Sequence, residues 1–326
     1  MNQSLSVFDP TAQDSKSKVR GVGRYVSLMK DSFPSWHFGH PSDSPVFINP
    51  FINLLSPPSI TKRYAKRQIG VIYDLIPLKH PAHFPAGLRG TISLIRNRLA
   101  FSTYDHFVTD SQTAKQDMVD ILHIPSEKIT VIYPYVKKYI TTPCNLPTTP
   151  YYLYVGDATW NKNLVNIAKA VQMSTTPCVF VGNVFTSSEK VDPSNVWNDE
   201  LIQFMQMTRN NNLFLFPGYV KDEELAYLYQ NTLGNILVSR DEGFGFSYAE
   251  ASAYGTASLL ADRSIFHETA VDSALFCDPE SPQSIHEGLQ KIGDEKIRGE
   301  LKIKALQRSK VFNQIDFIKG WKTLVE

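Results

Sequence analysis

Short runs of β-branched and aromatic residues alternate with amphipathic stretches along almost the whole chain. Such alternation is typical of a parallel sheet, because two parallel strands need a long crossover between them, usually a helix. The predicted strands are residues 5–9, 45–49, 69–74, 105–110, 129–134, 151–156, 178–182, 213–218, 235–239 and 257–261. The predicted helices are residues 22–32, 88–102, 112–122, 163–173, 197–209, 221–230 and 247–254. The sequence therefore predicts an α/β protein.

A segment rich in Thr and Pro, residues 140–150, separates two series of strands and is predicted to be an interdomain linker. The 326 residues are enough for two domains at roughly 150 residues each. We therefore expect two doubly wound domains that face a cleft. Near the end, Phe312, Ile315, Ile318 and Trp321 recur every three residues, which predicts one apolar stripe on a closing helix, with Trp321 as a packing residue.

Charge is divided unevenly along the chain. Residues 1–145 carry 17 Lys and Arg and 10 Asp and Glu, a net +7, whereas residues 146–326 carry 16 and 22, a net −6. A basic half could attract an anionic acceptor or a lipid surface, or could be an ordinary mixed surface. The densest basic stretch, residues 61–67, is too short to predict nucleic-acid binding without a recognised motif.

Several protein classes lack their usual sequence support. There is no apolar run long enough to span a bilayer and no secretion signal at the start, so we expect a cytoplasmic protein. The chain has no G-x-S-x-G elbow, no H-E-x-x-H and no P-loop. The three cysteines lack the spacing of a disulfide framework or zinc site and are expected to be thiols: Cys144, Cys178 and Cys277.

The stretch DEGFGFSYAEASAYG, residues 241–255, lies where a predicted strand ends and a predicted helix begins. Ligands of open α/β sheets bind at the carboxyl ends of strands. Gly243 and Gly245 permit positive φ angles, and amides at the start of the helix suit a phosphate. This loop is therefore predicted to bind an anion.

The two glutamates of this stretch each allow two interpretations. Ser247 and Glu250 have the spacing of a capping box, so Glu250 is either a cap or a ligand contact. Glu242 precedes the helix and is either an exposed loop carboxylate or a binding group. Similarly, Lys162 follows another predicted strand at a helix entrance, where it could contact a diphosphate or remain solvated.

Candidates in the first half are weaker. Gly21 and Gly23 in RGVGRY allow close backbone approach, but the last glycine of G-x-G-x-x-G is missing. Tyr73 and Asp74 end one predicted strand, and the nearby histidines lack a third metal ligand. Ser111 follows another strand and could be only a helix N-cap.

Together these elements resemble the retaining GT-B glycosyltransferases of family 4 (glycosyl transferases group 1). The resemblance covers nearly the whole chain. It rests on the E-x7-E block EGFGFSYAEASAYG, on YLYVGDATWNKNLVNIAKAV, on GVGRY, on VIYDLIP with FVTDSQTAKQDMVDILHIPSEKITVIYP, and on the last helix with its tryptophan. It implies a first Rossmann-like domain at residues 1–142, a nucleotide-sugar-binding domain at 143–310, and a closing helix at 311–326 that returns to the first domain.

The resemblance also implies roles for the candidate residues. Glu242 and Lys162 would be catalytic, contacting the transferred sugar and the diphosphate, and Glu250 would bind the ribose. Further donor contacts are implied for Gly243, Phe244, Gly245, Phe246, Gly21, Gly23 and Arg240. Acceptor contacts are implied for Tyr73, Asp74 and Ser111.

The implied activity is transfer of a hexose from a nucleotide-sugar to a glycan or lipid-linked acceptor, with retention of configuration and without a metal or other cofactor. A role in surface polysaccharide synthesis and peripheral contact with the inner face of the membrane go with it. The alternatives are a nucleotide-sugar epimerase or phosphorylase of the same fold and a non-catalytic sugar-binding relative.

Two positions depart from the family pattern. Many relatives have an arginine where this chain has Asp157, which would oppose diphosphate binding if it faced the phosphates. We therefore expect Asp157 to point elsewhere and to cap its turn. Many relatives also have a histidine where Tyr73 stands, so a histidine contact to the donor sugar is not expected.

Overall fold

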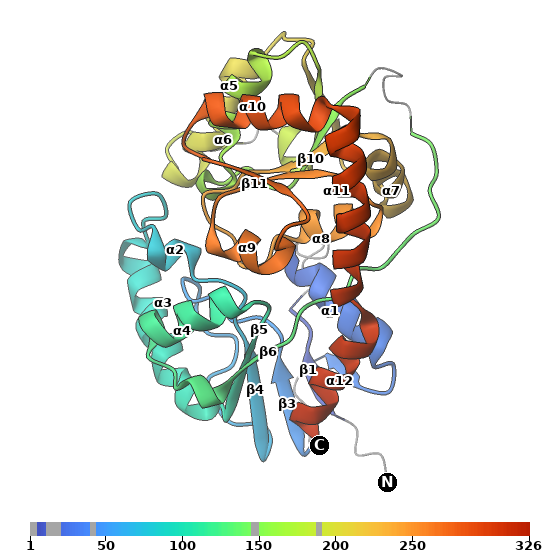
Figure 1. Ribbon diagram of the computed structural model, residues 1–326. Coiled ribbons are helices and arrows are strands. Elements are labelled where there is room, and N and C mark those ends of the chain that lie inside the picture. Colours follow the sequence, from blue (N-terminus) through green and yellow to red (C-terminus); the bar gives the residue numbers. More distant parts are fainter. Residues whose placement is uncertain (1–4, 11–20, 40–43, 145–149, 187–190) are drawn as a thin grey trace. The chain divides into compact units, whose positions relative to one another are not determined.

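The computed structural model describes residues 5–10, 21–39, 44–144, 150–186 and 191–326. The described chain divides into two compact units (Figure 1). Unit 1 comprises Met1–Tyr135 and Phe312–Glu326, and unit 2 comprises Val136–Val311. The division falls before the predicted linker, because residues 136–144 hydrogen-bond within unit 2: Tyr139 N–H to the Tyr254 hydroxyl at 2.8 Å and Thr142 N–H to Glu223 O at 3.1 Å. Residues 145–149 of the predicted linker lie outside the described residues.

Unit 1 is built on a parallel sheet that has six strands within the described residues, in the order β2-β1-β3-β4-β5-β6. The strands are β1 (Ser6–Phe8), β2 (His37–Gly39), β3 (Val46–Asn49), β4 (Arg67–Val71), β5 (His106–Thr109) and β6 (Ile129–Val131). The helices are α1 (Gly21–Ser32), α2 (Ile76–Lys79), α3 (Gly87–Ala100), α4 (Gln112–Leu122) and α12 (Gln314–Val325). Apart from β2 and α2, each of these overlaps a predicted element or stripe, and β4 and β6 both end three residues earlier than predicted.

Unit 2 has a parallel sheet that also shows six strands among the described residues, in the order β12-β11-β10-β7-β8-β9. The strands are β7 (Tyr152–Val155), β8 (Cys178–Val181), β9 (Phe214–Gly218), β10 (Gly234–Leu237), β11 (Ser258–Ala261) and β12 (Leu275–Cys277). The helices are α5 (Leu164–Gln172), α6 (Asp199–Thr208), α7 (Asp222–Asn231), α8 (Phe246–Ala253), α9 (Ser264–Ala270), α10 (Pro282–Gly293) and α11 (Glu295–Arg308). Strand β12 and helices α9 to α11 were not predicted from the sequence.

The closing helix α12 belongs to unit 1, where it packs against α1 and the end of β6. Trp321 is fully buried and meets Trp36 edge to face at 6.3 Å between ring centroids. Phe317 is also buried, against Tyr25 at 5.6 Å. The predicted stripe is wrong at Ile315, which is 78% exposed, because the true helical period of 3.6 residues shifts the buried face onto Phe317.

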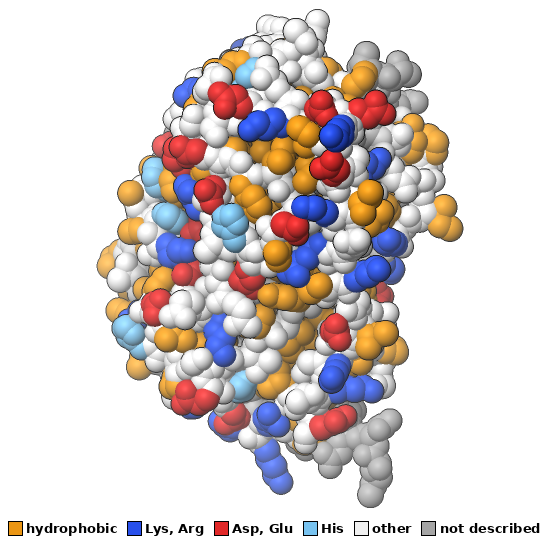
Figure 2. Space-filling view, viewed as in Figure 1, with side chains coloured by type: hydrophobic (Ala, Val, Ile, Leu, Met, Phe, Trp, Pro, Cys, Tyr) orange, Lys and Arg blue, Asp and Glu red, His pale blue; other side chains and the backbone are white. Residues whose placement is uncertain are grey.

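The uneven division of charge along the sequence corresponds to a mixed surface on the face of the molecule in view. Figure 2 shows Lys and Arg side chains interspersed with Asp and Glu over that face rather than gathered into one basic field. Within the basic stretch 61–67, Arg63 donates to both carboxylate oxygens of Asp105 at 2.7 Å. Part of the basic stretch therefore anchors a loop to β5.

His106 gives unit 1 a predictable pH dependence. Its Nε2 lies 2.8 Å from Oγ1 of Thr130. Burial lowers the pKa of His106, and the charges of Arg67, Lys115 and Lys128 lower it further. As pH falls, the unfolded chain therefore takes up this proton first, and the free energy of unfolding decreases below about pH 6.5. In urea titrations between about pH 7 and about pH 5, His106→Gln should show a smaller decrease than the parent. Equal decreases would contradict this.

Candidate active site

The loops after β7 and β10 meet at the centre of the unit 2 sheet. Counted from its own first strand, this sheet has the order 3-2-1-4-5-6 of dinucleotide-binding Rossmann folds. β7 and β10 are neighbours, but the chain leaves β7 toward β8 on one side and leaves β10 toward β11 on the other. The two outgoing connections diverge at the carboxyl ends of β7 and β10, and folds of this kind bind ligands in the crevice that such a divergence leaves.

This crevice brings together the two residues predicted to be catalytic. Nζ of Lys162, from the loop after β7, lies 2.5 Å from Oε1 of Glu242, from the loop after β10. The Ser239 hydroxyl donates to the same carboxylate oxygen at 2.7 Å. The side chains of Lys162 and Glu242 are only 20% and 10% exposed. Glu242 is thus a held, paired carboxylate and not the exposed loop residue that its alternative interpretation required.

Buried asparagines that the sequence analysis missed hold the two loops together. Asn161 Nδ2 donates to Asp241 O at 3.1 Å, and its own carbonyl accepts the Arg240 amide at 2.7 Å. Asn163 has a left-handed backbone, with φ of 62°, and donates to Val238 O at 3.0 Å. Asn tolerates that conformation better than most residues. The asparagines on either side of Lys162 were therefore the sequence signal from which this turn could have been predicted. These bonds fix the crevice independently of any ligand.

Arg240, predicted to be a donor contact, is tied to its own surroundings. Its guanidinium lies 5.0 Å from the Trp160 ring centroid and donates to Trp160 O at 2.5 Å. It also pairs with Glu200 at 3.3 Å and Glu280 at 3.3 Å. Burial raises the pKa of Glu200, while the Val165 amide and Arg240 oppose that rise. With its side chain only 11% exposed, Arg240 joins the two loops and shares its charge with two carboxylates.

The start of helix α8 offers backbone amides to the same crevice. Gly245 is its N-cap, with φ of 88°, and no described side chain caps the first turn. The Ser247 hydroxyl at the second helical position is buried and has no hydrogen-bond partner among the described residues. Phe244 is buried against Phe246, with ring centroids 5.3 Å apart. Residues 243–246 therefore form a glycine-containing turn that leads into a helix, and the first amides of that helix suit an anion.

The capping-box interpretation of Glu250 is wrong. The helix begins at Phe246 with Gly245 as its cap, so Ser247 lies inside the helix. Glu250 Oε2 instead accepts a hydrogen bond from the Tyr229 hydroxyl at 3.1 Å. Glu250 is the fifth residue of the helix, whereas the glutamate of a capping box is the third. The ligand role of Glu250 remains a prediction.

Asp157 caps its own turn. Its Oδ1 accepts the Ala158 amide at 2.9 Å, and its side chain is exposed. The Tyr154 hydroxyl donates to Asp157 O at 2.6 Å and braces the same turn. Asp157 therefore has a local structural role, as expected from the sequence.

The remaining candidates belong to unit 1. Gly21 is the first residue of α1, and Gly23 is buried within that helix. The Tyr73 hydroxyl donates to Pro50 O at 2.7 Å, and burial raises its pKa well above the usual value, so the phenol stays protonated. Asp74 is exposed and accepts the amide of Ile76. Ser111 caps α4 by accepting the Ala114 amide at 2.9 Å, which confirms the N-cap interpretation. No group of three or more metal-ligating side chains occurs among the described residues.

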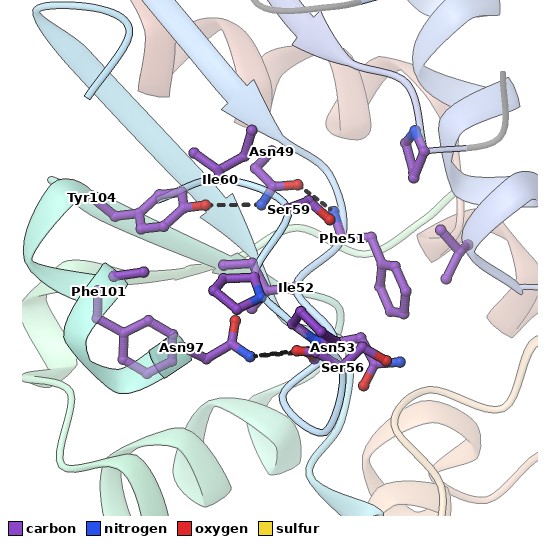
Figure 3. A pocket seen from close by; sticks show the side chains of 15 residues that line it. Asn49, Phe51, Ile52, Asn53, Ser56, Ser59, Ile60, Asn97, Phe101 and Tyr104 are labelled. Atoms are coloured by element: carbon purple, nitrogen blue, oxygen red, sulfur yellow. Dashed lines mark hydrogen bonds between the residues drawn. The ribbon is translucent and has the colours of Figure 1, made fainter. Parts of the chain in front are cut away.

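A pocket of about 320 Å³ opens in unit 1 where β3 ends. Strands β1 and β3 are neighbours from which the chain diverges, so this pocket also lies at a switch point. Figure 3 shows Tyr104 and Asn97 on its wall, with Asn49 Nδ2 donating to the Tyr104 hydroxyl at 2.8 Å. Phe51 lines the pocket and stacks on Tyr73 at 6.0 Å between centroids. Tyr73 thus supports the pocket wall through its ring.

The family follows from a comparison with known sequences. The sequence profile described as Glycosyl transferases group 1 matches residues 145–308, half of the chain, and includes both crevice loops. The chain belongs to the glycosyl transferases group 1 family. The curated relatives of this group 1 family member include "O-antigen chain mannosyltransferase RfbU" of Salmonella typhimurium (strain LT2), 25% identical over 70% of the chain. Another is "O-antigen chain mannosyltransferase B" of Escherichia coli, 24% identical over 64% of the chain. The matched stretches span 61% and 51% of those two proteins.

Solved structures support the fold of this group 1 family member. Anabaena Alr3699/HepE, determined with UDP and glucose, aligns with a TM-score of 0.73 at 14% identity and covers 99% of both chains. The sucrose-phosphate synthase of Thermosynechococcus elongatus aligns with a TM-score of 0.73 at 14% identity, covering 99% of this chain and 98% of its own. The two parallel sheets with their helices match these GT-B neighbours, so the predicted fold class is confirmed.

Proposed function

We propose that this protein transfers a hexose from a nucleotide-sugar to a glycan or lipid-linked acceptor during surface polysaccharide synthesis. The observation that carries the proposal is the Lys162–Glu242 pair at the switch point of the unit 2 sheet, beside the uncapped start of α8. The relatives' mannosyltransferase names support a hexose donor and a polysaccharide product. The proposed location is cytoplasmic, with peripheral contact at the inner face of the membrane.

The chemistry of transfer fits these residues. When the bond between the sugar and the diphosphate breaks, negative charge grows on the departing phosphate and positive charge grows on the sugar. Lys162 and the α8 amides would stabilise the phosphate, and Glu242 would position the sugar. A phosphate arriving here competes with Glu242 for the ammonium of Lys162, so donor binding would reorganise that ion pair. The buried Ser247 hydroxyl is available as a further donor to the phosphate.

Retention of configuration is part of the proposal. We favour attack from the face that the diphosphate leaves, with a donor phosphate oxygen accepting the acceptor's proton. A double displacement would instead need Glu242 as a nucleophile and a second group as acid and base. Glu242 is already held by Lys162 and Ser239, which suits a positioning group. Neither the favoured attack nor the double displacement requires a metal ion or a cofactor.

Acceptor binding is assigned to unit 1. The pocket at the end of β3 presents amide side chains and aromatic rings, a combination that suits the hydroxyls and apolar faces of a sugar. Tyr73 and the exposed Asp74 lie after the neighbouring strand β4. The self-capped Asp157 removes the main reason to expect a non-catalytic relative, and an epimerase would need no acceptor at all.

Nucleotide binding gives the direct test. We expect one of UDP, GDP or ADP, or its sugar, to raise the apparent thermal midpoint, because a ligand that binds only the folded state stabilises it. Glu250→Gln should weaken that nucleotide about tenfold, since a hydrogen bond to a charged group contributes roughly 1.5–3 kcal/mol. Isothermal titration calorimetry measures the affinity of the parent and of this variant for the nucleotide. Asp157→Asn is the matched control and should bind as the parent does. Absence of binding by every nucleotide would overturn the proposal.

A further inference from the structure

Helix α3 shows the reverse of the burial pattern that is usual for a surface helix. A surface helix normally buries an apolar stripe and exposes polar residues. The residues that α3 buries are small or polar: Gly90, Ser93, Asn97 and Ala100. The apolar residues that it exposes are Leu88 at 78%, Ile92 at 41%, Ile95 at 55% and Leu99 at 71%. Hydrophobic side chains reach the surface along the edge of unit 1 where Figure 1 places α3 (Figure 2).

Specific polar contacts hold the helix in this orientation. Asn97 is 2% exposed, and its Nδ2 donates to the carbonyls of Ser56 at 2.9 Å and Asn53 at 3.2 Å. A Cβ added at Gly90 would lie 3.8 Å from Cδ2 and the carbonyl oxygen of Leu55, so this face of the helix lies in van der Waals reach of that segment. Rotating α3 to bury its apolar stripe would leave the buried amide of Asn97 without these acceptors. The outward apolar stripe is therefore built into the packing of unit 1.

Arginines border the apolar stripe on both sides. At 100° per residue, Arg89 and Arg96 fall on one edge of the stripe and Arg98 on the other, and all three are exposed. Residues 87–100 contain no Asp or Glu. Arginine stems can lie along an apolar surface while their charged ends reach outward. A narrow apolar stripe between cationic edges is the pattern of helices that lie in the interface of an anionic bilayer.

We propose that α3 is the membrane-contacting surface of this protein and lies parallel to an anionic bilayer. Its apolar stripe would enter the boundary between headgroups and acyl chains, and Arg89 and Arg96 would contact lipid phosphates, while Arg98 donates to Ile121 O at 3.1 Å. A second copy of the chain fits this face poorly, because a two-fold contact sets the same patch against itself and brings arginine against arginine. None of the helices in the described residues is long and apolar enough to cross a bilayer.

Flotation of the full chain with vesicles tests this directly. We expect binding to vesicles of phosphatidylcholine with phosphatidylglycerol, weaker binding to phosphatidylcholine alone, and a decrease in binding as salt rises from about 0.05 M to about 0.5 M. Ile95→Gln with Leu99→Gln should lower the partition coefficient at least about tenfold. Arg89→Gln with Arg96→Gln should lower it about fivefold per arginine on anionic vesicles only.

Matched variants distinguish binding through this surface from non-specific adsorption to vesicles. Ile303 on α11 is 62% exposed and lies between two lysines, so Ile303→Gln should bind vesicles as the parent does. Ile95→Leu with Leu99→Met should retain binding, and an unchanged thermal midpoint should show that each variant is folded. Parent-like binding by the Ile95 and Leu99 Gln variant would overturn the proposal. So would a failure of the parent to bind anionic vesicles, or a parent dimer that this variant dissociates.

The vesicle experiment is independent of the proposed transferase activity. It contains no nucleotide-sugar and no acceptor, and none of its variants lies in the crevice of unit 2. Loss of vesicle binding would leave the nucleotide result intact. Failure of every nucleotide to bind would likewise leave the membrane proposal standing.

Discussion

Glu242→Gln and Lys162→Met should each lower kcat for sugar transfer by at least about 100-fold, which is the usual effect of removing a group that stabilises a transition state. The Glu242 carboxylate is held by Lys162 at 2.5 Å and by Ser239 at 2.7 Å. On the proposed roles, either change leaves the sugar or the leaving phosphate without its partner. The measurement is acceptor-dependent release of nucleoside diphosphate from the donor that thermal shift identifies. Ser239→Ala, which removes one supporting bond, should cost about tenfold.

A double-mutant cycle distinguishes catalysis from a structural ion pair. Each single variant should lower the free energy of unfolding by about 1–3 kcal/mol, because a partly buried charge loses its partner. The combination of Lys162→Met and Glu242→Gln should cost less than the two singles together, since neither charge is then stranded. If the two residues have the proposed catalytic roles, the double variant must nevertheless be inactive. Recovery of parent-like kcat in the double variant would show that the pair only holds the loops.

Trp321→Ala should lower the free energy of unfolding by about 3–5 kcal/mol. Trp321 is fully buried on α12 and packs edge to face on Trp36, so the smaller side chain leaves a cavity that rigid neighbours cannot close. Ile315→Ala, on the same helix but 78% exposed, should change it by less than about 0.5 kcal/mol. Urea unfolding followed by circular dichroism compares the two. Similar losses at both positions would contradict the observed orientation of α12.

The alternation of strands and helices predicted most of the fold. Parallel strands are buried on both faces, so they read as short apolar runs, and β3 or β8 could be found from that composition alone. The missed strand β2 has only three residues, of which His37 is exposed. Helices α10 and α11 follow the last predicted strand and were missed, although α10 carries only two charged residues, Glu287 and Lys291. Charged residues make up half of α11 and hid its apolar face.

The candidate site was predicted unevenly. Lys162 and Glu242 were found because each follows a strand, and parallel strands end at the same edge of a sheet. Asn161 and Asn163 were missed, because their importance lies in hydrogen bonds between loops 75 to 80 residues apart that no local pattern records. Ser239 was also missed, although the residue that it bonds, Glu242, is only three positions away. The same limit applies to α3, whose exposed apolar stripe looks in sequence like an ordinary core-facing stripe.

The sequence alone determined the α/β class, the order of the elements and the two carboxylates worth testing, because periodicity and strand ends are local properties of a chain. Only the tertiary structure decided which side of a helix faces inward and which partner a polar side chain meets. Glu250 bonds Tyr229 rather than capping α8, and α3 is anchored by Asn97 with Leu88, Ile92, Ile95 and Leu99 exposed. Both outcomes depend on acceptors supplied by distant segments, since a buried polar group must find its partner wherever the fold places one.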